Sequence, residues 1–124
     1  MVVVNRNSVS VFITKDTSTI REILAPRNSS VLKQSLAEAI LPVGAATIAH
    51  FHPKTEEIYY LLQGQALICV EDESREISAG DAVAIPAGKR HQIKNIGEIE
   101  LIFLCCCVPA YSDEDTVFCD TIVD

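Results

Sequence analysis

The segment "HFHPKTEEIYYLLQG", from His50 to Gly64, places two histidines one residue apart in an otherwise apolar, strand-like run. The chain has only three histidines among its 124 residues. Alternate residues of a strand face the same side, about 7 Å apart at a rise of roughly 3.3 Å per residue. The segment therefore predicts a strand that points the imidazoles of His50 and His52 into one space.

The composition favours a single all-β domain. Hydrophobic residues make up 48% of the chain and aromatic residues only 6%, so the core must consist mainly of Val, Ile, Leu and Ala, which suit strands. A net charge of −7 excludes the basic stripe that a nucleic-acid partner requires. With no charged leader and no run near the roughly 18 apolar residues of a membrane span, we expect a soluble cytoplasmic protein without a membrane partner.

Short apolar stretches separated by turn residues recur from Leu32 onward, which is typical of a barrel or sandwich. Before them, Asp16–Ala25 predicts a short helical turn, because either Asp16 or Thr17 offers an N-cap and three aliphatic side chains share one helical face. We expect one structural domain in three parts. These parts are a strand and helical-turn extension (1–33), a barrel (34–108) and an acidic tail (109–124) that folds over an edge or frays.

In two segments of the chain, glycine, histidine and a few other polar or turn-forming residues stand at fixed spacings. In the first, five, one, four and six residues separate Gly44, His50, His52, Glu57 and Gly64 in turn. In the second, Gly80 and Asp81 are followed after four, one, two and three residues by Pro86, Gly88, His91 and Asn95. Together these segments resemble the two signature motifs of the cupin superfamily. The resemblance spans residues 44–95 and implies a double-stranded β-helix, the jelly-roll barrel.

The resemblance names His50, His52, Glu57 and His91 as ligands of one divalent metal ion. The residues themselves agree, because imidazole and carboxylate donors from neighbouring strands are able to meet at one ion, about 2.0 to 2.2 Å from it. The nitrogen-rich set suits Fe, Mn, Ni, Cu or Zn without choosing among them. Two alternatives stay open: histidines that only pack in the core, and a cupin fold without an occupied metal site.

Four protein ligands leave positions open on an octahedral ion, and open positions are typical of functional rather than structural metals. We therefore expect a metal-binding cupin that acts on a small oxygen-rich molecule, by dioxygenase-type or isomerase chemistry. The alternative is non-enzymatic binding or sensing of a small ligand in the same pocket, since a fold does not fix a function.

Two residues are candidates for the substrate pocket. Tyr59 has the same parity as Glu57 along its strand and is expected to line the cavity. Glu38 would point inward if it shares the inner face with Gln34, although the apolar residues of the same parity equally mark an apolar wall.

The strand predicted at 101–108 is apolar on both faces, whereas one face of an antiparallel strand is usually solvated. We infer that a second subunit covers its outer face and that the protein is a homodimer; burial under a terminal segment of the same chain is the alternative. Cys105, Cys106 and Cys107 are expected to be reduced, buried thiols, because adjacent strand residues face opposite ways. Cys105 and Cys107 share a face that is able to look toward the metal.

Overall fold

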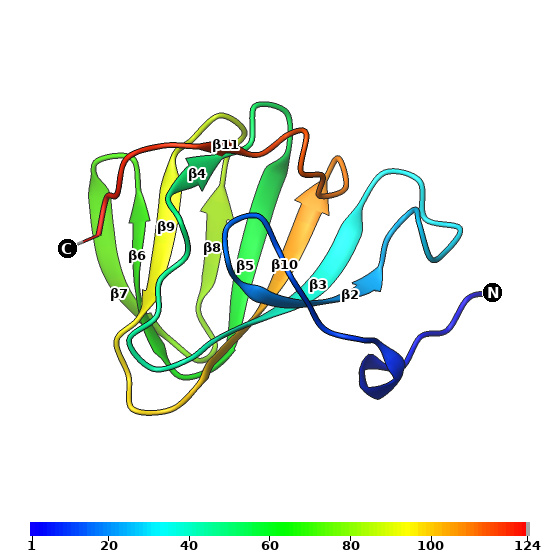
Figure 1. Cartoon of the computed structure of the whole chain (residues 1–124), viewed down its shortest axis with the longest axis horizontal. Coiled ribbons are helices and arrows are strands. Elements are labelled where there is room, and N and C mark those ends of the chain that lie inside the picture. Colours follow the sequence, from blue (N-terminus) through cyan, green and yellow to red (C-terminus); the bar gives the residue numbers. More distant parts are fainter. Residues whose placement is uncertain (124) are drawn as a thin grey trace.

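The computed structural model describes residues 1–123, which form two antiparallel β-sheets facing each other across one core (Figure 1). The only helical element of this range is the 3-10 turn η1 (Arg6–Ser8), so no helix here is long and apolar enough to cross a membrane. The predicted all-β jelly roll is confirmed.

The two sheets use strands from the whole chain. In spatial order, the larger sheet contains β1 (Phe12–Ile13), β2 (Thr19–Leu24), β3 (Ser35–Leu41), β10 (Leu101–Val108), β5 (Glu56–Gln63) and β8 (Ala82–Ile85). The smaller contains β11 (Val117–Phe118), β4 (His50–Phe51), β9 (His91–Asn95), β6 (Gln65–Val70) and β7 (Glu73–Ser78). Because β4 and β9 are paired in the smaller sheet although they are distant in sequence, the two motifs meet only in the folded chain.

Buried and exposed side chains alternate along the central strands of the larger sheet, and the buried ones form its inner face. In β5 the buried residues Glu57, Tyr59 and Leu61 alternate with exposed ones, and in β10 Phe103 and Cys105 are likewise buried. This period of two is what a half-buried strand requires. The apolar inner residues pack with Ile68 and Ile93 of the smaller sheet and with the rest of the core: Ile20, Ala39, Leu41, Ala66, Ile85 and Leu101.

The helical turn predicted over Asp16–Ala25 is wrong. Residues 19–24 form strand β2, which pairs with β1 and β3, and the only helical turn described is η1. The β-branched residues Thr19, Ile20 and Ile23 favour an extended backbone. An isolated helix of about ten residues is marginal in water, so pairing along β3 decides the outcome.

The outer face of β10 is not closed off by the described chain. Ile102 and Leu104 are half-buried, while Cys106 and Val108 are exposed. On the adjoining β5, three apolar side chains of the same face are also exposed: Ile58 (49%), Tyr60 (42%) and Leu62 (46%). The alternative that a terminal segment of this chain buries the whole face therefore does not hold for residues 1–123.

The acidic tail folds over a sheet edge instead of fraying. Strand β11 pairs with β4, and the backbone N–H groups of Ile122 and Val123 both donate to the side-chain oxygen of Gln92 in β9. Asp124, the last residue of the predicted tail, lies outside the described range. The docked tail brings residues 111–116 next to the predicted metal ligands.

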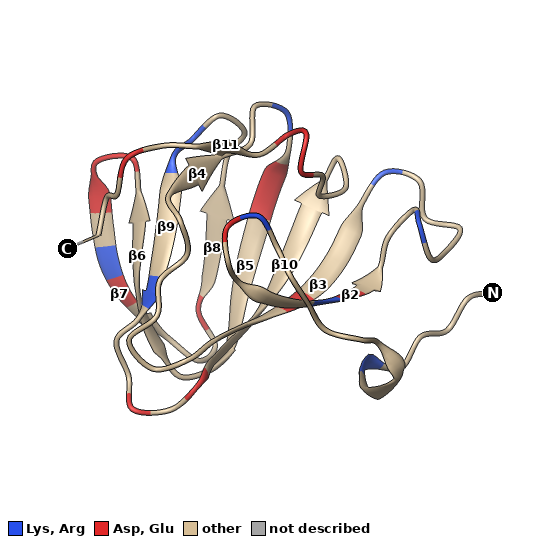
Figure 2. Cartoon of the chain, viewed as in Figure 1, with Lys and Arg blue, Asp and Glu red and all other residues tan. Residues whose placement is uncertain are grey.

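Charged residues are dispersed over both sheets and their connections (Figure 2), and every charged residue from Glu98 onward is acidic. Two of the charged pairs lie on the outer side of the larger sheet, where Glu38 contacts both Arg6 and Arg21. The C-terminal tail, residues 109–124, contributes acidic residues and no basic ones to the net negative charge.

We predict that Gly64→Ala destabilises the protein more than Gly80→Ala. Both glycines have positive φ values, +94° and +97°, which cost a residue with a Cβ about 1 to 2 kcal/mol. A Cβ on Gly64 would also lie 3.1 Å from the carbonyl oxygen of Glu100, whereas a Cβ on Gly80 meets no described atom within 4 Å. Urea unfolding should show an extra loss of about 1 to 3 kcal/mol for Gly64→Ala; equal losses would contradict the close approach.

Candidate metal centre

Four side chains predicted as metal ligands meet between the two sheets. His50 belongs to β4, His52 follows it, and His91 opens β9 directly opposite His50 in the β4–β9 pair. Glu57 projects from β5 in the facing sheet. All four are buried, with at most 6% of any of them exposed.

The donor atoms converge. One ligand atom from each of His50, His52 and His91 lies within 4.8 Å of the other two. Glu57 Oε1 lies 3.5 Å from His52 Nε2 and 3.4 Å from His91 Nε2. Atoms that bind one ion at about 2.0 to 2.2 Å are separated by distances of this order.

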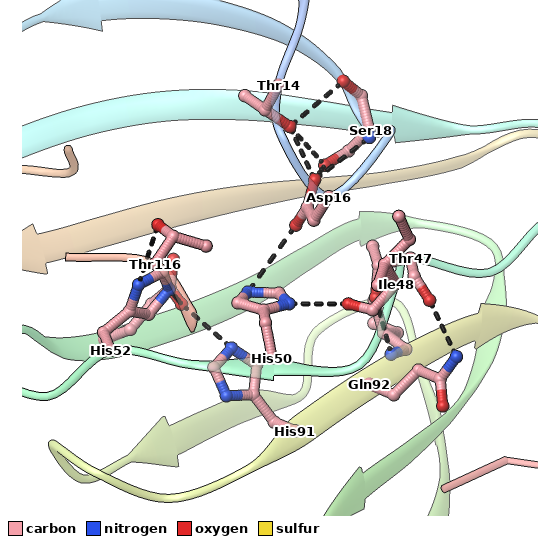
Figure 3. A network of polar contacts seen from close by, with 12 residues as sticks. Thr14, Asp16, Ser18, Thr47, Ile48, His50, His52, His91, Gln92 and Thr116 are labelled. Carbon is pink, nitrogen blue, oxygen red and sulfur yellow. Dashed lines mark hydrogen bonds and ion pairs between the residues drawn. The ribbon is translucent and has the colours of Figure 1, made fainter. Parts of the chain in front are cut away.

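Every imidazole is oriented by a hydrogen bond from its Nδ1 atom to a backbone carbonyl, and Figure 3 shows the one from His50 to Ile48. The Nδ1 atoms of His50 and His91 donate to the carbonyls of Ile48 at 2.7 Å and Lys89 at 3.0 Å. His52 Nδ1 donates to the carbonyl of Asp115 at 3.0 Å. Because a carbonyl only accepts, each neutral ring carries its hydrogen on Nδ1 and keeps the Nε2 lone pair for a metal.

Two buried polar atoms at the centre have no hydrogen-bond partner among the described residues: Glu57 Oε1 and His91 Nε2. Such orphans are rare, because an unsatisfied buried polar group costs about 1 to 3 kcal/mol. A divalent cation satisfies both atoms at once. The donors present therefore fit a metal ion, and the three-histidine cluster supports metal binding.

The electrostatics of the centre favour an ionised carboxylate. Burial opposes ionisation of Glu57, but the imidazoles of His52 and His91 outweigh it and hold the pKa of Glu57 well below its usual value. Burial and the neighbouring His91 lower the pKa of His50. Burial acts in the same direction on His52, yet Glu57 and the Asp115 carbonyl outweigh it and raise the pKa of His52.

The thiol of Cys107 holds Oε2, the second carboxylate oxygen of Glu57. Cys107 Sγ donates to Glu57 Oε2 at 3.2 Å, which leaves Oε1 directed at His52 and His91. Burial, with Glu57 nearby, raises the pKa values of Cys107 and Cys105, so both thiols stay protonated at neutral pH. All five cysteines are free; Cys106 is exposed, which corrects the prediction that all three consecutive thiols are buried.

A cavity of about 40 Å³ is lined by three of these four side chains, those of His50, His52 and Glu57. That volume accepts one to a few water-sized groups. Tyr59 lines the cavity and is 3% exposed; burial raises its pKa, so the hydroxyl stays protonated.

Glu38 does not line the cavity, which corrects its assignment to the substrate pocket. The inner face of β3 includes Ser35, Ala37 and Ala39, which line the cavity, and Leu41, which packs in the core. Glu38 has the opposite parity and is buried outside the sheet by Arg6, whose guanidinium donates to it at 2.8 Å. The small side chains on this inner face leave room for the cavity. Glu38 was assigned wrongly because the odd or even position of a residue in a strand does not show which face of the strand is inner.

Three nearby residues were missed by sequence reasoning. Asp16 lines the cavity and its Oδ2 lies 3.6 Å from His50 Nε2. Tyr111 also lines the cavity, with its ring centroid 5.9 Å from that of His52, and Asp115 supplies a carbonyl to His52. The polar cluster 14–18 between two short apolar stretches is a signal for a turn, but it does not indicate that Asp16 reaches the centre.

Comparison with known proteins agrees with this arrangement. Residues 37–107, more than half of the chain, match the family model described as the cupin domain. The chain belongs to the cupin family. This cupin is also 48% identical over 110 residues to an uncharacterised protein of Methanocaldococcus jannaschii, covering 89% of this chain and 88% of that relative.

Other relatives are similar over shorter stretches. An oxalate-binding protein of Thermotoga maritima is 36% identical over 64 residues, covering 52% of this chain and 53% of that protein. Among solved structures, a predicted oxalate decarboxylase of T. maritima has a TM-score of 0.77 and 24% identity over 87% of this chain and 99% of that one. KdgF from Halomonas has a TM-score of 0.78 and 18% identity over 92% and 97%. The two structures show that the fold is shared.

We predict that Cys107→Ala weakens metal binding, because Glu57 loses the donor that holds its second oxygen. Loss of such outer partners typically costs about 10- to 100-fold in metal affinity. The matched control is Cys106→Ala, the next residue of the same strand, whose side chain is exposed. Competition with a chromophoric chelator measures both affinities; equal affinities for the two variants would contradict the role of Cys107.

Proposed function

We propose that this cupin holds one divalent metal ion with His50, His52, Glu57 and His91, and that the ion acts on a small oxygen-rich molecule. The observation that carries the proposal is the pairing of three Nδ1–H groups with carbonyls, which leaves three Nε2 lone pairs beside an orphaned carboxylate oxygen. Fe, Mn, Ni, Cu and Zn all suit this donor set.

Bound there, a divalent ion would supply Lewis-acid catalysis, and a redox-active one would also support dioxygenase-type chemistry. The chain provides the surroundings. The Glu57 carboxylate offsets part of the cation charge, and the protonated Tyr59 hydroxyl is a donor at the cavity wall rather than a base. Core side chains such as Phe103 exclude water from the inner end of the cavity.

The size of the cavity supports a ligand of few heavy atoms. Its volume of about 40 Å³ leaves space for little beyond the groups that bind the ion. The oxalate-binding relative is named for a two-carbon dianion, which agrees with a small, oxygen-rich ligand for this chain.

Binding without turnover is the second candidate function. It is supported by that same relative, whose name describes binding only, and by raised pKa values that keep Tyr59, Cys105 and Cys107 protonated. Isomerase chemistry requires a base near the substrate, and these three groups do not provide one at neutral pH.

We predict that Glu57→Gln lowers metal affinity by more than about 100-fold, a larger loss than outer partners cause, because it removes a charged ligand. Glu56→Gln, the neighbouring residue with an exposed side chain, is the matched control and should bind metal like the wild type. Elemental analysis and chelator competition measure the effect. Equal metal binding by both variants, or none by the wild type, would reject the proposed centre.

The same samples separate the two functions. Protein loaded in turn with Fe(II), Mn, Ni and Zn is mixed with diols, catechols, keto acids and sugar phosphates, and oxygen uptake and isomerisation are followed. Turnover that depends on one metal and is lost in Glu57→Gln supports an enzyme. Tight binding without turnover supports the binding function.

We also propose that the chain forms a homodimer through the outer face of β5 and β10. The exposed Ile58, Tyr60 and Leu62 form an apolar row beside Cys106 and Val108, and dimer interfaces are more apolar than other surfaces.

Leu62→Asp should therefore convert a dimer to a monomer in sedimentation velocity at micromolar concentration, because it buries a charge in the interface. Ile13→Asp, an equally apolar and 73% exposed position on β1, should leave the dimer intact. A wild-type chain that sediments as a monomer would reject the interface.

A further inference from the structure

Asp16 is a buried carboxylate that reaches the metal centre from outside both cupin motifs (Figure 3). It lies in the turn between β1 and β2, is 8% exposed, and lines the same cavity as His50 and Glu57. Asp16 Oδ2 lies 3.6 Å from His50 Nε2, the nitrogen whose lone pair is free. The turn thus adds a second carboxylate to the centre.

The two oxygens of Asp16 have different surroundings. Oδ1 accepts hydrogen bonds from the Thr14 hydroxyl at 2.5 Å, from the Ser18 N–H at 3.0 Å and from the Ser18 hydroxyl. Within residues 1–123, all hydrogen bonds to this carboxylate go to Oδ1. The turn therefore fixes one oxygen and directs the other, Oδ2, at the centre.

The backbone holds this turn against the metal-binding segment. The Asp16 carbonyl accepts from the Ile48 N–H at 3.0 Å, and the Ile48 carbonyl in turn accepts from His50 Nδ1 at 2.7 Å. Thr17, the next residue, has a φ of +75°, a conformation that costs a β-branched residue energy and that concentrates at functional sites. One peptide segment thus positions both the imidazole and the carboxylate.

Asp16 and Glu57 occupy different places around the imidazoles. Glu57 Oε1 lies between two of them, 3.5 Å from His52 Nε2 and 3.4 Å from His91 Nε2. The only ion-pair contact that Asp16 makes with the described residues is with His50. Glu57 is therefore placed as a metal ligand, whereas Asp16 lies at the rim, beside the space left for a bound molecule.

We propose that Asp16 selects the molecule bound at the metal: Oδ2 accepts a hydrogen bond from a hydroxyl of that molecule and repels a carboxylate in the same place. The inference rests on the proposed function. Glu57 and Asp16 together offset the two positive charges of the ion, so a ligand with one carboxylate adds one negative charge to the centre; a second carboxylate would add another and would face Asp16. The favoured class is a small α-hydroxy acid, as opposed to a dicarboxylate.

Glycolate and oxalate test this assignment, because both have two carbons and differ in one group, a hydroxyl or a carboxylate. Calorimetry on zinc-loaded protein gives the ratio of the two dissociation constants. Asp16→Asn should shift that ratio toward oxalate by at least about tenfold, through loss of a charge-assisted hydrogen bond and of a repulsion. A ratio within about twofold of the wild-type value would overturn the proposal, as would zinc-loaded wild-type protein that does not bind glycolate.

The Asp16→Asn substitution keeps a side-chain carbonyl oxygen that accepts hydrogen bonds from Thr14 and Ser18, so the turn is retained. Asp81→Asn is the matched control: the same substitution at an exposed carboxylate that accepts from the Ser78 N–H, expected to leave the ratio unchanged. If Asp16→Asn fails to fold by circular dichroism, Asp16→Ser carries the same expectation.

Zinc affinity, measured without any ligand, separates the possible failures. We expect Asp16→Asn to bind zinc within about threefold of the wild type, since outer groups that orient no ligand atom matter little. A loss beyond about tenfold would make Asp16 a metal ligand and overturn the assignment. Normal zinc binding with an unchanged ratio rejects only the role of Asp16, whereas a wild type that binds no zinc rejects the proposed function itself.

Discussion

The arrangement of this cupin's centre depends on three hydrogen bonds from imidazole Nδ1 atoms to backbone carbonyls. Without them each ring would rotate about its side chain and place either nitrogen toward the cavity. With them, the Nε2 lone pairs of His50, His52 and His91 share one small volume. The acceptors lie in the connections just before β4 and β9 and in the docked tail, so the backbone beside the strands orients the rings.

Buried carboxylates in this fold are distinguished by their partners. Glu38 lies against arginines outside the larger sheet, whereas Glu22 of β2 lines the cavity and is paired with Arg27. Inside, Glu57 and Asp16 each use one oxygen for neutral donors and direct the other at imidazoles. A buried charge needs a compensating partner; the inner pair obtains it from imidazoles and, in the proposed function, from a cation.

The docked tail and the N-terminal hairpin enclose a centre whose four proposed ligands all lie within the family match. Lys15 of the hairpin turn donates to the Thr116 carbonyl, and Asp115 accepts from the N–H groups of Lys54 and Thr55. Segments outside residues 37–107 therefore close the cavity and contribute Asp16 and Tyr111 to its wall. In the proposed function, the shared motifs provide the metal ligands and the flanking segments limit which molecule fits.

Alternation and motif spacing were enough to predict the all-β fold and the four residues that meet at the centre, because both are local properties of the chain. Parity also put Tyr59 on the same strand face as Glu57.

Two further features required the folded chain. Residues 19–24 form a strand because they pair with β3. Glu38 lies on the outer face, which parity could not show because it does not say which face of a strand is inner. Asp16, Cys107 and the Asp115 carbonyl acquire their roles through contacts across many residues of sequence. Contacts of this kind produce no recognisable pattern in the sequence, because only folding brings the atoms together.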